Sequence, residues 1–326
     1  MNFSVISEKS NTVEGFALVR KSDKKTTAKG SFFLDMILAD KSGQINAKLW
    51  DYNDEINGVF EINSLVKVRG NISVYNGEDQ LKVERIRKVI DSDNIIIDDY
   101  VPSAEYDGQS MFNEILQIVS SFKDNDLKIL TAELLNEYKE KLLYFPAAFK
   151  LHHAIRSGLL LHTLSIVRLA QGVCNVYPFV DSDLLICGAI LHDIGKTVEF
   201  KVSNVGIADG YSVDGSLIGH IVRGAMAVRT AGEKLSLPEE KIMLVEHMIL
   251  SHHGEPEFGA AVRPMFLEAE LLSELDLMDA RVYEICEAVS STENLGFSPR
   301  QWALDNRRLY NHGRTDMNAS ADLNIK

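Results

Sequence analysis

The sequence predicts an α+β multidomain protein, in which a small N-terminal β-barrel precedes an all-helical domain. Two observations predict this division. Over residues 1–100, apolar residues mostly alternate with polar ones in short segments, whereas from about residue 108 they recur every three or four positions. The chain of 326 residues is also long enough for two such domains.

The first domain is expected over residues 1–95. Its candidate strands are rich in β-branched and aromatic residues and are separated by the turn-forming sequences DKSG (40–43), DYNDEING (51–58) and YNGED (75–79). The candidates are TVEGFALVR, GSFFLDMILAD, GQINAKLWD, SLVKVRGNISVY and DQLKVERIRKV. About five short strands without a convincing helix between them favour an OB-like barrel, with SH3-like and other Greek-key barrels as alternatives.

The second domain is expected over residues 110–310, after an acidic linker at 96–109 and before a flexible polar tail at 311–326. Its apolar residues have the spacing of amphipathic helices. Helices are expected over residues 110–122, 126–145, 153–171, 183–193, 216–235, 238–253 and 265–291.

The charge is unevenly distributed along this acidic chain. The net charge is −13, but the first 100 residues hold 14 Lys and Arg against 16 Asp and Glu, with a basic cluster, RKSDKKTTAKG, at 20–30. Overall acidity therefore does not exclude a polyanionic ligand.

The N-terminus lacks the pattern of a secretory signal, the longest apolar run is about eight residues, and the three cysteines form no CxxC pair. These features favour a cytoplasmic protein without a membrane segment.

Histidine is concentrated in the predicted helical domain, where eight of the nine lie between residues 152 and 253. A single histidine is most often structural, but four predicted helices each carry one beside an acidic, basic or small residue. A fifth helix carries Asp276 and Asp279, which share one face. Imidazole with carboxylate suits Mn, Fe, Co, Ni or Zn, and ligands from several helices can build a dinuclear site.

The segment LLICGAILHDIGK, residues 184–196, ends an apolar run with adjacent ionisable residues. An unpaired buried charge is costly, so such residues usually find a partner or bind a metal. We expect the apolar run to form a buried wall that holds His192 and Asp193 against a metal cluster, with the Asp193 carboxylate between two ions.

These motifs resemble a known family. HHAIRSGLLLHT, LLICGAILHDIGK, EHMILSHHGEPEFGA, EAELLSELDLMDAR and LDNRRLYN are similar to sequences of the YhaM-type 3′→5′ exoribonucleases, a family of the HD metal-dependent phosphohydrolase superfamily. The resemblance covers nearly the whole chain. It implies an OB-fold domain followed by an HD domain.

The resemblance also implies a set of metal ligands. They are His162, His192, Asp193, His220, His252, His253 and Asp276. Asp276 is preferred to Asp279 because the HD pattern places its ligand three residues before the Asp-Ala pair. His252 and His253 can both bind only if their helix ends there, as Gly254 and Pro256 suggest. His247 points elsewhere on that helix and is expected to be structural.

Two divalent ions are expected, with Mn²⁺ preferred and Co²⁺ or Fe²⁺ as alternatives. Some HD enzymes hold a third ion with a glutamate four residues before the first histidine, but Gly158 occupies that position. The ions would activate a shared water as hydroxide to attack the scissile phosphate. Lys196 and Arg223 would stabilise charge on the phosphoryl oxygens, although a surface salt bridge explains Arg223 equally well. His152 and His153 could contact substrate, cap a helix or do neither.

The barrel is expected to bind a single strand by combining basic and aromatic side chains. The candidates are Phe33, Trp50 and Tyr75, with Lys21, Lys24, Lys25 and Lys29 on a neighbouring loop. Strand alternation allows only one of Phe32 and Phe33 to point outward.

The preferred function is a metal-dependent 3′→5′ exonuclease of single-stranded RNA, with single-stranded DNA as a further substrate. The 3′ polarity rests on the resemblance alone. One alternative is an HD phosphohydrolase of a small nucleotide or cyclic nucleotide. Another is a nucleic-acid-binding adaptor with an inactive HD domain. The long helix at 265–291 is compatible with a homo-oligomer, although a core role explains it equally well.

Overall fold

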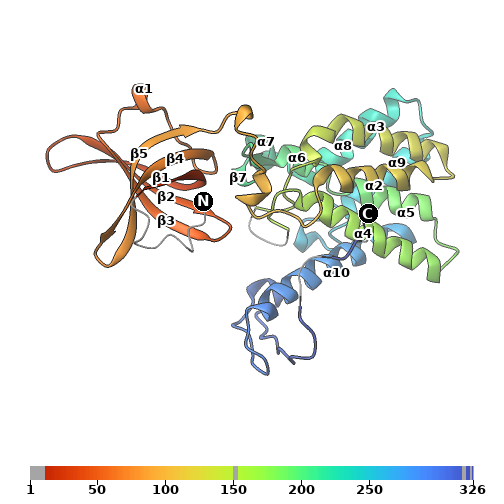
Figure 1. The fold of residues 1–326 in the computed structure, drawn as a ribbon. Coiled ribbons are helices and arrows are strands. Elements are labelled where there is room, and N and C mark those ends of the chain that lie inside the picture. Colours follow the sequence, from red (N-terminus) through yellow and green to blue (C-terminus); the bar gives the residue numbers. More distant parts are fainter. Residues whose placement is uncertain (1–11, 150–152, 318–320, 324, 326) are drawn as a thin grey trace. The chain divides into compact units, whose positions relative to one another are not determined.

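The computed structural model describes residues 12–149, 153–317, 321–323 and 325, and divides the chain into two compact units (Figure 1). The barrel unit ends at Ser103 and also includes Val202–Ile207. The helical unit comprises Ala104–Lys201 and the chain from Ala208 onward.

The barrel unit is a closed five-stranded barrel with the strand order β1-β2-β3-β5-β4. Its strands β2 and β3 form a hairpin, β3 pairs with β5 in parallel, and β1 pairs with β4 to close the barrel. The strands are β1 (Val13–Thr26), β2 (Phe32–Asp40), β3 (Gly43–Trp50), β4 (Leu65–Tyr75) and β5 (Glu78–Lys88). This closed barrel confirms the prediction for the N-terminal part of the chain.

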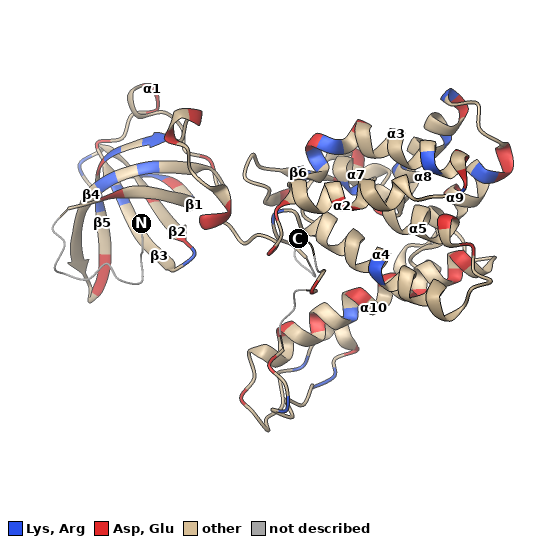
Figure 2. Cartoon of the chain, turned by 45° about the vertical axis from the view of Figure 1, so that its right-hand side comes forward, with Lys and Arg blue, Asp and Glu red and all other residues tan. Residues whose placement is uncertain are grey.

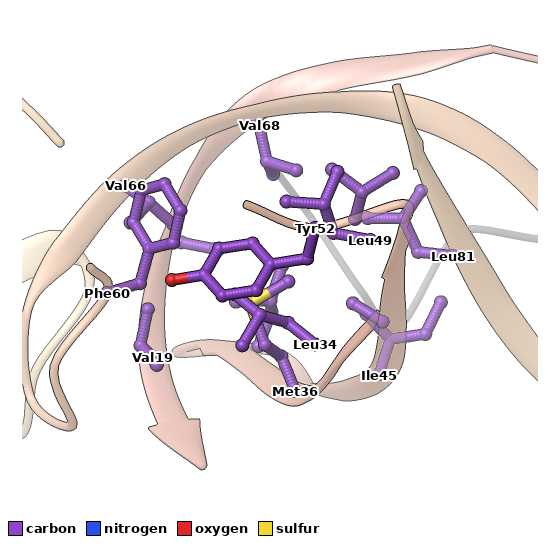
Figure 3. Packing of buried hydrophobic residues seen from close by; sticks show 14 residues of the cluster. Val19, Leu34, Met36, Ile45, Leu49, Tyr52, Phe60, Val66, Val68 and Leu81 are labelled. Carbon is purple, nitrogen blue, oxygen red and sulfur yellow. The ribbon is translucent and has the colours of Figure 1, made fainter. Parts of the chain in front are cut away.

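The barrel interior is filled by alternate residues of each strand (Figure 3). On β2 the buried residues are Leu34, Met36 and Leu38, while their neighbours face outward. Tyr52 and Phe60 enter the same cluster from the segment between β3 and β4. The Tyr52 hydroxyl donates a hydrogen bond to the Gly58 carbonyl at 2.9 Å, which satisfies its polar end.

Two local predictions in this unit are wrong. The segment 51–58, which reads as a turn, contains the short helix α1 (Asp54–Asn57), because the Asn53 side chain accepts a hydrogen bond from the Glu55 amide and caps it. Lys21, Lys24 and Lys25 lie on β1 rather than on a loop. A register shift at Val19/Lys21 allows β1 to bend and to continue pairing with β2.

The chain after β5 forms two 3-10 helices, η1 (Asp91–Asp93) and η2 (Ile97–Asp99). Val101 follows them and is buried in a second apolar cluster of the barrel unit, with Leu18, Leu65 and Val205. This cluster is packed outside the barrel core.

The helical unit contains the predicted helices and most of a short hairpin, whose residues Val202–Ile207 are counted with the barrel unit. The α-helices are α2 (Gly108–Ser120), α3 (Asn125–Leu142), α4 (Gly158–Val176), α5 (Ser182–Leu191), α6 (Lys196–Glu199), α7 (Val213–Leu217), α8 (His220–Lys234), α9 (Glu239–Ser251) and α10 (Leu267–Ser290). Two 3-10 helices are also present in its described residues: η3 (Pro256–Phe258) lies between α9 and α10, and η4 (Trp302–Leu304) follows α10. The hairpin of β6 (Phe200–Val202) and β7 (Ala208–Tyr211) has no counterpart in the sequence prediction of an all-helical domain.

Helix α5 lies at the centre of the helical unit. The Asp181 side chain caps it by accepting a hydrogen bond from the Leu184 amide at 3.1 Å. Every residue from Leu184 to Leu191 is buried, which explains why this segment is apolar on all sides. The helix therefore delivers the two residues that follow it, His192 and Asp193, into the interior of the unit.

Helix α4 is the one described helix whose length and composition would allow it to cross a membrane. Its best window has a mean hydropathy of 1.3, and 56% of that window is buried inside the structure. Residues Gly158–Val167 are buried without interruption, so its apolar character is that of a core helix.

The buried thiol of Cys187 on α5 provides a test of this core. Burial raises the pKa of Cys187 to about 12 from an ordinary value of 9.0. We expect Cys174 and Cys286, which are half-buried, to react with a thiol reagent at pH 8, and Cys187 to react only after unfolding. The contribution of this thiol to stability is present below pH 9 and is lost as the pH rises toward 12. Three fast-reacting thiols in the native protein would contradict the buried position.

Candidate metal centre

The structure brings together all seven residues that the sequence predicted as metal ligands, and most of them come from helix ends. His192 and Asp193 directly follow α5, His220 is the first residue of α8, and His252 and His253 directly follow α9. His162 lies near the start of α4, and Asp276 lies in the first half of α10. Because α9 ends at Ser251, both neighbouring histidines can face the same side, which a continuing helix would prevent.

The first cluster of ligand atoms surrounds one oxygen of the Asp193 carboxylate. Asp193 Oδ2 lies 3.3 Å from His192 Nε2 and 3.7 Å from His162 Nε2. The same His162 nitrogen lies 3.1 Å from Asp276 Oδ1. His162, His192 and Asp193 are buried, and their ligand atoms are close enough together to hold one metal ion.

The second cluster faces the other oxygen of the same carboxylate. Asp193 Oδ1 lies 3.6 Å from His220 Nε2 and 3.7 Å from His252 Nε2. Ligand atoms of His220, His252 and His253 lie within 4.8 Å of one another. The Asp193 carboxylate therefore stands between two groups of imidazoles, each of which can hold a metal ion.

In all five histidines among the candidate ligands, Nδ1 faces a carbonyl or carboxylate oxygen. Nδ1 of His192, His252 and His253 donates to the backbone carbonyl of Ala189, Ile249 and Phe258, respectively. A carbonyl oxygen can only accept, so the proton must be on Nδ1 and the lone pair on Nε2. Nε2 is the atom that faces Asp193 in His192 and His252, as a metal ligand requires.

Carboxylates replace the carbonyls for the other two histidines. Glu199 Oε1 lies 2.9 Å from His220 Nδ1 and also accepts a hydrogen bond from the His220 amide at 3.1 Å. Asp279 Oδ2 lies 2.8 Å from His162 Nδ1 and 3.1 Å from His153 Nε2. Asp279 thus orients the His162 ring through its Nδ1 atom, whereas Asp276 lies on the Nε2 side of the ring. The sequence analysis did not single out Glu199. The one signal for its role as a partner of His220 is its position six residues after Asp193.

Three buried atoms at the centre fit a bound cation. Asp193 Oδ1, His220 Nε2 and His252 Nε2 have no hydrogen-bond partner among the described residues. An unsatisfied buried acceptor is costly, and here three of them converge. The residues therefore fit a divalent metal, which would accept lone pairs from all three.

The pKa values of the cluster suit the same use. Burial lowers the pKa of His252 well below its ordinary value, so this imidazole is neutral at pH 7. Burial raises the pKa of Asp193, but the Lys196 charge, with a further contribution from the adjacent His192 ring, outweighs it and holds the pKa well below its ordinary value. Burial also lowers the pKa of His162, yet hydrogen bonds to Asp276 and Asp279 raise it to about 10. A metal bound at His162 would therefore displace a proton.

The two predicted catalytic cations differ in position. Lys196 Nζ lies 2.5 Å from Asp193 Oδ2, beside the first cluster, and the side chain is only 12% exposed. Arg223 instead donates through Nε and Nη2 to the Asp214 carboxylate, with 2.8 Å from Nε to Oδ2. This pair is the surface salt bridge that the sequence offered as the alternative role for Arg223.

Other histidines occupy supporting positions. His153 is buried and contacts the Tyr283 ring at 4.4 Å as well as Asp279, whereas His152 lies outside the described residues. His247 packs on the Phe266 ring and accepts a hydrogen bond from the Met265 amide at 3.0 Å. This contact is consistent with its predicted structural role.

The barrel unit carries a separate aromatic cluster on its outer surface. The rings of Phe33 and Trp50 are stacked at 4.8 Å, and Lys48 Nζ lies 5.4 Å to 5.8 Å from the rings of Phe33, Trp50 and Tyr75. The three predicted aromatic residues thus meet around Lys48. The sequence missed Lys48, although its position two residues before Trp50 places it on the same strand face.

The four predicted lysines do not join this cluster in the described contacts. Lys24 and Lys25 pair with Asp54 and Asp35, and Lys21 lies 3.0 Å from Asp23. Lys29 is exposed in the turn after β1.

Phe32 lies on the same side of β2 as the buried Leu34, yet 48% of it is exposed. It is exposed because it is the first residue of β2 and lies at the strand end.

Comparison with known proteins agrees with both units. The HD domain matches residues 159–281, and an OB-fold nucleic acid binding domain matches residues 13–89. A protein of Listeria welshimeri named 3'-5' exoribonuclease YhaM is 37% identical over 306 residues, which are 93% of this chain and 96% of that protein. The chain belongs to the YhaM family of 3′-5′ exoribonucleases.

A second YhaM protein, from Bacillus licheniformis, is 35% identical over 306 residues and covers 94% of this chain and 96% of its own length. The YhaM family was the one that the motifs of this sequence resemble, and the predicted OB and HD domains are confirmed with it. HD domains bind divalent metals, and the His and Asp clusters of this chain are able to hold them.

The glycine of the HDIGK motif provides a test of the site geometry. A Cβ atom at Gly195 would lie 2.0 Å from the His220 carbonyl oxygen, so alanine there must displace the start of α8. We expect Gly195→Ala to cost about 1–3 kcal/mol of stability and to weaken Mn²⁺ binding measured by calorimetry. In the control Gly172→Ala, the new Cβ meets nothing within 4 Å and lies inside α4, so binding should be unchanged and stability equal or higher. Equal Mn²⁺ affinities for the two variants would contradict this role of Gly195.

Proposed function

We propose that this chain is a metal-dependent exonuclease that removes nucleotides from the 3′ end of single-stranded RNA by phosphodiester hydrolysis. One observation carries the proposal. The Asp193 carboxylate presents each of its oxygens to a different group of imidazole Nε2 atoms, at 3.3–3.7 Å. This arrangement suits two adjacent divalent ions, a centre that recurs in nucleases and phosphatases.

The residues that would hold the ions fall into two sets with one shared member. His162, His192 and Asp276 form one set, His220, His252 and His253 form the other, and Asp193 belongs to both. Mn²⁺ is the proposed metal because imidazole and carboxylate donors suit it, and Co²⁺ or Fe²⁺ would fit the same donors. Such ions lower the pKa of bound water and neutralise charge on phosphoryl oxygens.

The residues around the centre would prepare it for a phosphodiester. Asp279 and Glu199 hold His162 and His220 in the tautomer that presents Nε2. Lys196 keeps its ammonium beside Asp193, where it would donate to a non-bridging phosphoryl oxygen and stabilise developing charge. Arg223 is engaged by Asp214, so we assign it a structural role in joining α7 to α8.

The barrel unit would supply the affinity for a polymer. Stacked aromatic rings with a cation among them are a common surface for unpaired bases, because every base has a face on which an aromatic ring can stack. Phe33, Trp50 and Tyr75 with Lys48 form such a surface. Since stacking does not read the ribose 2′-hydroxyl, we expect single-stranded DNA to bind there as well. Joining both units in one chain raises the local concentration of the bound strand at the metal centre.

The choice of RNA and of the 3′ end follows the names of the YhaM relatives. A small nucleotide as substrate is less well supported, because it would leave the aromatic surface of the barrel without a use. An inactive adaptor is less well supported because six of the seven candidate ligands fall into two groups able to hold a metal ion, and Asp276 lies 3.1 Å from His162 of one group. We also propose a cytoplasmic location, which suits the three free cysteines, and allow for self-association through the long helix α10.

A 5′-labelled single-stranded RNA incubated with Mn²⁺ tests the activity. We expect a ladder that shortens from the 3′ end, is abolished by EDTA, and is reduced at least about 100-fold in Asp193→Asn, which removes the shared carboxylate charge. Asp316→Asn, at an exposed aspartate of the same unit, should behave as the parent protein. Intact RNA with a mobility shift would favour the adaptor. Intact RNA without a shift would direct the search to nucleotides and cyclic nucleotides.

The aromatic surface of the barrel predicts a separate defect. Trp50→Ala removes one stacking ring and should weaken binding of single-stranded RNA by about 1–3 kcal/mol in a fluorescence anisotropy titration. Phe179→Ala, at an aromatic residue of the helical unit that is 75% exposed, is the matched control and should bind as the parent does. Equal affinities for the two variants would show that Trp50 does not contact the strand.

A further inference from the structure

The segment after α10 differs in charge from the unit to which it belongs. Residues 296–314, here called the arginine loop, contain four arginines and one aspartate, a net charge of +3. In contrast, residues 101–326 as a whole carry a net charge of −11, since the chain carries −13 and the first 100 residues carry −2. Figure 2 shows red segments along α10 and blue ones in the segment that follows it.

The arginine loop also exposes large aromatic side chains. Trp302 is 72% exposed, Phe297 is 55% exposed and Tyr310 is 46% exposed. Arg308 stacks over the Phe297 ring at 5.3 Å, and the Phe297 and Tyr310 rings are 5.1 Å apart. Exposed rings interleaved with guanidinium groups match what unpaired bases and phosphates require of a protein surface.

The loop is held in place by its own buried contacts. Ser298, Leu304 and Asn311 are buried within it. The Asn311 side chain donates to the Thr292 carbonyl at 2.8 Å, and the Ser298 amide donates to the Leu309 carbonyl at 2.8 Å. A fixed backbone lowers the entropy cost of binding, because the exposed rings are already positioned.

The arginines keep donors available for a ligand. Arg300 donates to the Asn306 carbonyl at 3.0 Å and makes no ion pair in the described part of the chain. Arg307 lies 3.8 Å from Asp305, and both side chains are more than half exposed, so a polyanion can compete with this pair. Five N–H donors in each guanidinium leave several for phosphate oxygens.

We infer that the arginine loop is a second binding element for single-stranded RNA, separate from the aromatic surface of the barrel. This inference rests on the proposed function. Helix α10 connects the candidate metal centre to the arginine loop. From Asp276 it continues to Ser290, about 20 Å along the helix axis, and the loop follows. An RNA of several nucleotides can therefore contact the metal centre and the loop at once.

A second copy of this chain is the competing ligand for the same surface. Interface cores are usually depleted of charge, and two loops of net charge +3 would repel each other across a two-fold axis. These considerations favour RNA.

The test measures RNA affinity in the Asp193→Asn background, where the strand is not degraded. With a labelled RNA of about 20 nucleotides, we expect Trp302→Ala to weaken binding about fivefold or more and Trp302→Phe to restore most of it. Arg300→Gln should reduce the slope of log affinity against log salt concentration by about one. Phe179→Ala is the matched control and should bind as the background protein does.

Three outcomes would overturn the inference. If Trp302→Ala and Arg300→Gln bind RNA as Phe179→Ala does while the wild-type chain still degrades RNA, the loop is not an RNA site and the proposed function stands. If the wild-type chain neither binds nor degrades RNA, the proposed function fails and this inference with it. If Trp302→Ala sediments more slowly than its parent and keeps its RNA affinity, the loop is a surface for a second copy.

Discussion

The helical unit depends on one constraint, the burial of the Asp193 carboxylate between two groups of imidazoles. Removing a carboxylate from water costs several kcal/mol unless charge and hydrogen bonds compensate. Within the protein the compensation comes from the Lys196 ammonium beside one oxygen. The Nε2 lone pairs of His220 and His252 that face the other oxygen do not compensate the charge. Among the described residues, the buried acceptors without a hydrogen bond at this centre are Asp193 Oδ1, His220 Nε2 and His252 Nε2, which a metal would satisfy. The unit thus retains an unfavourable polar centre inside a well-packed core, which is expected at a functional site.

Packing around this centre explains several residues that do no chemistry. Residues Leu184–Leu191 of α5 are apolar or small because they are enclosed by other helices where the helix approaches the site. Gly195 lets the start of α8 approach closely enough to place His220. Gly158 is similarly close to the His153 carbonyl, where any side chain would collide with the backbone. The positions of the ligands are therefore set by the close approach of backbones as much as by the ligands themselves.

The candidate metal ligands could be singled out from the sequence because each lies in a short motif with its own local pattern, and the structure brings them together. The spacing of Asp276 and Asp279 could not decide between them, because both lie on one face of α10. The packing of α4 against α10 shows that Asp276 reaches His162 Nε2 and that Asp279 reaches Nδ1. Lys48 was missed because its role appears only when β2, β3 and β4 bring three rings around it. The strand position of Lys21, Lys24 and Lys25 depends on a register shift, which pairing creates and local composition does not encode.

The most direct test of the two-ion centre is a crystal structure of the protein grown with Mn²⁺, with anomalous scattering measured at the manganese edge. The geometry predicts two anomalous peaks, one beside His162, His192 and Asp276 and the other beside His220, His252 and His253, with Asp193 between them. A single peak, or a peak that does not contact Asp193, would contradict the claim that this carboxylate is shared by two metal ions.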